Sequence, residues 1–226
     1  MKNKLLFWGM TTKGLPVLNL EEQRVLGALM EKSRTTPEYY PLTLNALVTA
    51  CNQKTSRNPV VSYDENTVML AIDSLRKKGL VGTVTGGTGR VTKYKHNFAI
   101  AYPIVPSEVT ILCLLLLRGP LTPGEINNMS GRMFEFESLD EVQQNLDNLA
   151  KAEHPYLVQL AKRPGKKEAR YAHLLGGPIA IEDYAESALP SSNPENRVNL
   201  EERLEKVEND LAQLRVEFDQ LMQQLT

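Results

Sequence analysis

Hydrophobic residues recur at helical spacing in three successive segments near the start of the chain. Asn19 precedes the first segment, and Glu22 is placed to complete a capping box with it. Prolines 37 and 41 interrupt this helix, because each disfavours a helical predecessor. A second helix is predicted over residues 44–51. A third ends at Lys78, before a left-handed Gly79, with a buried face of Val68, Ile72 and Leu75.

Two segments that alternate between apolar and polar residues follow the third helix. They cover residues 80–85 and 90–97, on either side of the glycine-rich residues 86–89. No helix follows these glycines, so a hairpin tip explains them better than a phosphate-binding loop. The predicted order is therefore three helices and a hairpin.

The same order repeats in the next part of the chain. A helix is predicted over residues 107–117, a capping box over residues 122–125 opens a second, and Ser138 precedes a third. Residues 157–160 and 169–174 are predicted strands. Val68, Ile72 and Leu75 then align with Val142, Leu146 and Leu149, and Thr43 aligns with Thr122. An internal duplication is the simplest account of this order.

Three helices followed by a hairpin are typical of a winged-helix domain, in which the third helix commonly faces DNA. We therefore predict a mainly α fold with small β-hairpins, containing two winged-helix domains at residues 19–98 and 99–177. Residues 1–18 form an N-terminal extension, and residues 178–199, rich in Pro, Ser and Asn, form a linker.

The last segment, residues 200–226, carries a heptad pattern of hydrophobic residues. This spacing predicts a coiled-coil helix, because a lone helix would leave its apolar stripe in water. We expect a homodimer; the alternative is a helix that folds back on its own domains, and the strand orientation of the coiled coil stays open. The predicted dimer seam consists of Leu200, Leu204, Val207, Leu211, Leu214, Phe218, Leu221 and Leu225.

Composition predicts a folded, cytoplasmic protein. The chain has 226 residues, of which 42% are hydrophobic and 23% charged, so it can bury cores. Its longest apolar run, residues 111–117, is too short for a membrane span, and no membrane association is expected. The net charge of -1 hides an uneven distribution, because residues 178–226 contain 11 acidic and 4 basic side chains. The preceding domains are therefore more basic than the total suggests.

Catalytic and metal-binding motifs are missing from the sequence. Cys51 and Cys113 lack a neighbouring partner cysteine, so free buried thiols are expected, although a disulfide between them stays open. His96, His154 and His173 do not follow zinc-site spacing. We expect no enzyme activity, no cofactor and no small-molecule ligand.

Cationic side chains near the hairpins are the expected contacts to DNA phosphates. Such contacts release counterions, so binding should weaken with salt. The alternative is a solvated hairpin, because lysines also protect exposed strand edges from aggregation. The predicted contacts are Lys54, Arg57, Arg90, Lys93, Lys95, Lys162, Arg163, Lys166, Lys167 and Arg170.

The outward faces of the two third helices argue against reading of bases in the major groove. Both faces carry acidic residues that would repel phosphates, while Met69 and Leu70 cannot hydrogen-bond to bases. Met69 and Leu70 are therefore the expected protein interface in a second hypothesis, an interaction scaffold. Residues 112–117 belong to that interface too, unless the two domains pack on each other there.

Several sequence blocks resemble the YceH-like family of bacterial proteins. The most specific block is residues 36–47, followed by residues 50–54 and 58–60. Further blocks lie at residues 90–94, 116–119, 163–166 and 170–171. The resemblance implies two winged-helix domains and supplies no catalytic or ligand-binding residues. It leaves the DNA-binding and scaffold hypotheses both open.

Overall fold

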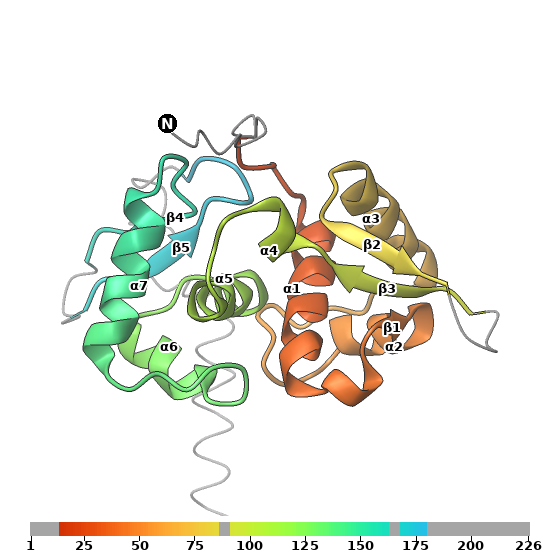
Figure 1. Cartoon of the computed structure of the whole chain (residues 1–226), viewed down its shortest axis with the longest axis horizontal. Helices are drawn as coiled ribbons and strands as arrows, with labels where there is room; N and C mark the ends of the chain where they lie inside the picture. The colour runs from red at the N-terminus through yellow and green to blue at the C-terminus, as the bar shows by residue number, and fades with distance from the viewer. Residues whose placement is uncertain (1–13, 86–90, 163–167, 180–226) are drawn as a thin grey trace, which may run out of the picture. The chain divides into compact units, whose positions relative to one another are not determined.

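The computed structural model describes residues 14–85, 91–162 and 168–179, all within one compact unit of the chain (Figure 1). The predicted linker beyond residue 179 and the coiled-coil seam lie outside the described residues. In the described ranges, no helix combines the length and apolar character needed to cross a membrane.

The first half begins with helix α1, Leu20–Thr35. Its predicted capping box is present, because the Glu22 amide donates to Asn19 Oδ1 and the Asn19 amide donates to Glu22 Oε2, each at 2.8 Å. A short 3-10 helix, η1 (Pro37–Tyr39), and strand β1 (Leu42–Thr43) follow. Helix α2, Leu44–Cys51, has the bounds that the sequence predicted.

Helix α3, Glu65–Lys77, starts at an Asp64 cap and is followed by Gly79 with a φ of +80°. Strands β2 (Val81–Val84) and β3 (Lys93–His96) then form an antiparallel hairpin. Strand β1 adds to the free edge of β3, so the sheet order is β1-β3-β2. Helix α4, Phe98–Ala101, follows β3.

The second half repeats this order with helices α5 (Pro106–Arg118), α6 (Pro123–Ser130) and α7 (Leu139–Lys151). Strands β4 (Leu157–Gln159) and β5 (Tyr171–His173) form its antiparallel hairpin. In place of a third strand, Leu121 forms a single bridge with Tyr171.

The two halves also repeat individual contacts. Leu42 pairs with Tyr94 in the first half, just as Leu121 pairs with Tyr171 in the second. The hydroxyl of Tyr94 lies 3.8 Å from Met69 Sδ on α3, and the hydroxyl of Tyr171 lies 2.8 Å from Gln143 Nε2 on α7. These matching contacts support the internal duplication that the aligned helices predicted.

Helices α1 and α5 pack against each other and join the two halves (Figure 1). Gly27 permits the close approach, since a Cβ there would lie 2.9 Å from Leu117 Cδ2. Residues 111–117 are buried throughout, and Cys113 Sγ donates to the Gly27 carbonyl at 3.3 Å. The sequence left two explanations of this apolar run open, and the structure favours the second: the run is buried where the two halves pack on each other, and it is not exposed to a partner protein.

The described residues confirm a mainly helical fold with small antiparallel hairpins. Helix α5 starts at Pro106, one residue earlier than predicted. Val105 is the residue that caps it, and the backbone amide of Val105 donates to Glu108 Oε2 at 3.0 Å. Ser107, the predicted start, is buried and donates to Asn145 Oδ1 on α7 at 2.6 Å. The strands are shorter than their alternating patterns because pairing covers only part of each pattern.

Candidate functional site

The first hairpin presents lysines on one face of β3. Lys93 is exposed and Lys95 is half-buried, while Tyr94 between them points into the core. Lys54, in the loop after α2, is also exposed. In the described ranges these three lysines form no salt bridge. They are therefore free to contact a phosphate, whereas Arg90 lies outside the described residues.

Arg57 has a different environment from the hairpin lysines. Its side chain is 0% exposed and donates to Glu31 Oε2 at 2.6 Å and to the Ala50 carbonyl at 2.9 Å. Burial alone would raise the pKa of Glu31, but the hydrogen bonds and charge of Arg57 outweigh this effect and lower it. Arg57 is therefore not available at the surface as the predicted phosphate contact. Its side chain instead links α1, α2 and the loop that follows α2.

The second hairpin divides its predicted contacts in the same way. Lys162 is exposed just after β4. Arg170 instead donates to Glu125 through both terminal nitrogens at 2.7 Å, and to the Pro120 carbonyl at 2.7 Å. Its guanidinium thus fixes the hairpin to the start of α6. Arg163, Lys166 and Lys167 lie outside the described residues.

The outer face of α3 combines acidic and apolar side chains. Leu70 is 63% exposed, as an interaction surface requires, but Met69 is half-buried against Tyr94. Glu65 is exposed in the first turn beside the Asp64 cap, whose hydrogen bonds with Thr67 lower its pKa. This charge at the start of the helix opposes close contact with a phosphate backbone.

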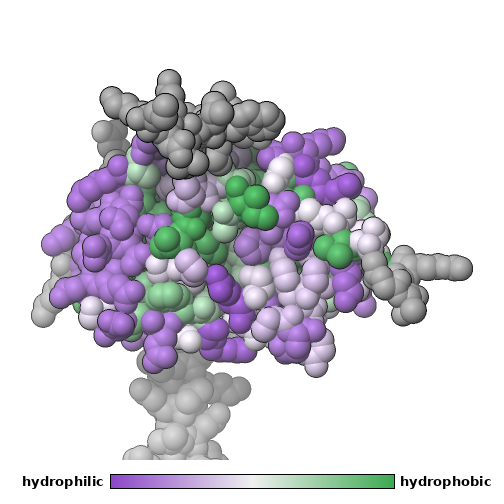
Figure 2. All heavy atoms as spheres, viewed as in Figure 1, coloured by the Kyte–Doolittle hydropathy of each residue, from purple (hydrophilic) through white to green (hydrophobic). Residues whose placement is uncertain are grey.

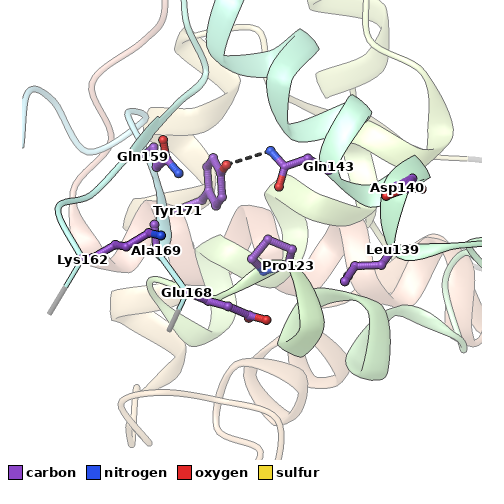
Figure 3. A pocket seen from close by; sticks show the side chains of 9 residues that line it. All are labelled: Pro123, Leu139, Asp140, Gln143, Gln159, Lys162, Glu168, Ala169 and Tyr171. Atoms are coloured by element: carbon purple, nitrogen blue, oxygen red, sulfur yellow. Dashed lines mark hydrogen bonds between the residues drawn. The ribbon is translucent and has the colours of Figure 1, made fainter. Parts of the chain in front are cut away.

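A groove of about 280 Å³ lies between α7, the start of α6 and the second hairpin (Figure 3). Hydrophilic side chains also dominate the α7 side of the surface in Figure 2. The groove thus lies between the third helix and the hairpin of the second half. It is lined by Pro123, Leu139, Asp140, Gln143, Gln159, Lys162, Glu168, Ala169 and Tyr171.

The amide of Gln143 is fixed by its neighbours. Its nitrogen donates to Asp147 Oδ1 and to the Tyr171 hydroxyl, each at 2.8 Å. Asp147 is held in turn by Lys151 at 2.7 Å, and these hydrogen bonds lower its pKa. Both amide protons of Gln143 are therefore used, so it cannot make the two-bond contact to adenine that an unpaired glutamine offers. What remains toward the groove is its acceptor oxygen.

Sequence reasoning did not find this groove, although the aligned repeats contained a signal for it. Tyr94 and Tyr171 occupy matching places, and each contacts the residue that follows the buried Val68 or Val142. The polar partner Gln143 replaces Met69 in the second half. A comparison of the two halves at this position would have indicated a polar groove in the second half alone.

Reactive and metal-binding groups do not gather in the described part of the chain. No three His, Cys, Asp or Glu side chains meet there in an arrangement suited to a metal ion. Cys51 and Cys113 are free and buried, and burial raises the pKa of Cys51 to about 12 and that of Cys113 further. Both thiols therefore stay protonated at neutral pH and are poor nucleophiles.

Comparison with known proteins places the chain in a family. The family described as "Protein of unknown function, DUF480" matches residues 18–166. The chain belongs to this family. Similar proteins include a UPF0502 protein of Opitutus terrae, 49% identical over 202 residues, which cover 89% of this chain and 84% of that protein. The UPF0502 protein YceH of Escherichia fergusonii is 43% identical, with 92% and 97% covered.

A UPF0502 protein of Shewanella sp. is 42% identical over 220 residues, covering 92% of this chain and 99% of its own. These matches confirm the resemblance to the YceH-like family. The names of the relatives give no substrate, partner or activity, so the function must be argued from the residues.

Proposed function

We propose that this protein is a non-enzymatic, dimeric DNA-binding protein, built from two winged-helix domains and associated with transcription. The order of three helices and a hairpin in each half supports the winged-helix assignment. The heptad pattern of residues 200–225 supports the dimer.

The observation that carries this proposal is the set of lysines on the hairpins without acidic partners. Lys93 and Lys95 on β3, and Lys162 after β4, are paired with no acidic group in the described ranges. An unpaired lysine gains more from a phosphate than one that must first leave a carboxylate. Arg163, Lys166 and Lys167 stand between Lys162 and β5 in the sequence and add positive charge to this segment.

The expected mode of binding is contact with the DNA backbone, with little sequence preference. The acidic starts of α3 and α7 oppose entry into the major groove, and Gln143 has no amide proton left for a base. Backbone contact by lysines produces salt-dependent affinity that differs little between sequences.

The test is a titration of the full chain against a fluorescent duplex of random sequence at two salt concentrations. Replacing Lys162, Arg163, Lys166 and Lys167 together by Ala should weaken binding at low salt and reduce the dependence of affinity on salt. A matched control replaces Arg34, Arg76, Arg132 and Lys151 by Ala, which removes the same charge outside the second hairpin. This control should retain most of the affinity.

Equal losses in both variants would assign binding to net charge and contradict a hairpin site. An absence of binding at low salt would contradict DNA binding altogether. It would favour the second hypothesis, an interaction scaffold for a partner protein. One observation supports that alternative: Leu70 is 63% exposed on the outer face of α3, where its counterpart in α7 is Gln144.

A further inference from the structure

The groove between α7 and the second hairpin is lined by several hydrogen-bond acceptors, two of which are carboxylates. Carboxylates repel the phosphates of DNA, so this lining is unusual for a surface that faces DNA. Asp140 from α7 and Glu168 from the hairpin both line it, and both are exposed. Among the lining residues that the structure describes, Lys162 is the one cation, and it lies at the opposite end from Asp140 (Figure 3). The end of the groove near α7 therefore attracts a cation and repels a phosphate.

The Gln143 oxygen adds a positioned acceptor to these two carboxylates. The orientation of the Gln143 amide is fixed, because its Nε2 must face Asp147 Oδ1 to donate a hydrogen bond to it. Within the described ranges no donor reaches the Gln143 oxygen. In Figure 3 this oxygen points toward Pro123 and away from the Tyr171 hydroxyl, into the lined space. A bound donor would therefore meet an acceptor that is already in place.

Apolar groups form the rest of this end of the groove. Pro123 and Leu139 lie on this side, whereas Ala169 lies beside Lys162, and the buried Tyr171 lines the groove between them (Figure 3). A long aliphatic stem can pack on such a surface while its charged end reaches the acceptors. Arginine combines this stem with a planar group of five donors, which suits several acceptors around one space.

We infer that this groove binds an arginine side chain of a partner polypeptide, with the stem on Pro123 and Leu139 and the guanidinium between the Asp140, Glu168 and Gln143 oxygens. The occupant follows from charge complementarity, because an anionic ligand would face two carboxylates. The groove includes Lys162, one of the proposed DNA contacts, but its three acceptors are not among those contacts, and arginine binding does not require DNA.

The first half provides an internal comparison. The alignment of Val68 with Val142 and of Tyr94 with Tyr171 places Asn66, Met69 and Val91 where the second half has Asp140, Gln143 and Glu168. All three acceptors of the proposed site are thus replaced by neutral side chains, two of them apolar. Arginine binding is expected in the second half only.

The experiment follows backbone amide signals of the isotope-labelled full chain by NMR during titration with the capped tripeptide acetyl-Ala-Arg-Ala-amide. Saturable shifts should concentrate at Leu139, Asp140, Gln143 and Ala169, and not at Asn66 or Met69. The capped peptide acetyl-Ala-Gln-Ala-amide is the neutral control, and it should bind at least roughly tenfold more weakly because it lacks charge-assisted hydrogen bonds.

Two variants test the acceptors without disturbing the fold. Gln143→Met introduces the residue that contacts Tyr94 in the first half, so packing on Tyr171 is retained. Asp140→Asn changes an exposed side chain. Each should weaken arginine-peptide binding by roughly tenfold. Glu153→Gln, which removes an exposed acid beyond α7, is the matched control and should leave the affinity unchanged.

Several results would overturn the inference. These are equal binding of the glutamine peptide, shifts centred outside the groove, or affinity unaffected by both variants. Perturbation of the same groove amides by a random DNA duplex, with equal sensitivity to Gln143→Met, would assign the groove to nucleic acid instead. Failure of DNA to bind at the hairpins contradicts only the proposed function, because the peptide titration contains no DNA.

Discussion

Arg57 shows at the scale of one residue why a basic loop can mislead. In the sequence it stands in a polar loop near Lys54, and nothing nearby marks it as different. In the structure its side chain is buried and paired with Glu31, which lies far back in α1. A pairing between distant positions leaves no local pattern, so only the folded chain separates these two cations.

Replacing Arg57 by Leu should destabilise the fold strongly. The change leaves Glu31, whose side chain is 12% exposed, without its main partner, and an unpaired buried charge costs about 3–5 kcal/mol. Urea unfolding at pH 7 measures this loss. Lys54→Leu, in the same loop but exposed, should change the free energy of unfolding by less than about 0.5 kcal/mol. Equal effects of the two substitutions would contradict an internal role for Arg57.

His96 and His173 should make stability fall in mildly acidic solution. Burial lowers the pKa of each to about 4 from an ordinary 6.5, and the positive charge of Arg34 contributes at His96. Between these values the unfolded chain takes up protons that the folded chain excludes, so stability is lost as the pH falls from 6.5 toward 4. At pH 5 the loss is about 1–2 kcal/mol for each histidine.

Urea unfolding of the double variant His96→Gln, His173→Gln at pH 7 and pH 5 tests this pH dependence. The variant should lose less stability than the wild type between the two pH values, whatever its stability at pH 7. Acidic groups shared by both proteins cancel in this comparison. An equal loss in the two proteins would show that the histidines are not its source.

At the scale of elements, the long helices and their caps were readable from sequence, and the shortest elements were not. Asn19, Thr122 and Ser138 cap α1, α6 and α7 as their local sequence predicted. Strand β1 has two residues and helix α4 has four, too few to show a period. The Leu121 bridge depends wholly on its partner Tyr171, so no local signal exists for it.

The packing of α1 on α5 depends on the missing side chain of Gly27. A methyl group there would lie 2.9 Å from two atoms of Leu117 and 3.2 Å from Leu116 Cβ. Gly27→Ala should destabilise the protein by about 1–3 kcal/mol, because overpacking exceeds the gain of about 1 kcal/mol in helix propensity.

Gly124→Ala in α6 is the matched control, since its nearest neighbour would lie at 3.7 Å, an ordinary contact. This substitution should be neutral or slightly stabilising. Thermal or urea unfolding compares the two variants. A Gly27→Ala protein as stable as Gly124→Ala would mean that the helices separate at little cost.

At the scale of the whole molecule, sequence revealed which side chains carry charge but not which of them are already paired. Lys93 and Lys162 remain available, whereas Arg57 and Arg170 form ion pairs inside the protein. The groove beside α7 needed three separate elements to meet, and only the tertiary structure brings them together. The proposed DNA contacts are thus fewer than the sequence predicted. Each remaining lysine is therefore expected to contribute a larger share of the DNA-binding free energy.

Fewer contacts in each chain make the predicted dimer important for DNA affinity. Two linked copies bind one duplex more tightly than either alone, because the second contact becomes intramolecular.

Leu211 lies in the middle of the predicted seam, and Leu211→Glu should place a charge between the helices and produce monomers in analytical ultracentrifugation. DNA affinity should fall roughly tenfold or more at unchanged salt. Gln213→Glu adds the same charge on the outward side of the heptad and should leave both the dimer and the affinity intact. If Leu211→Glu stays dimeric, the seam does not hold the copies together; if it becomes monomeric with full affinity, each chain binds DNA alone.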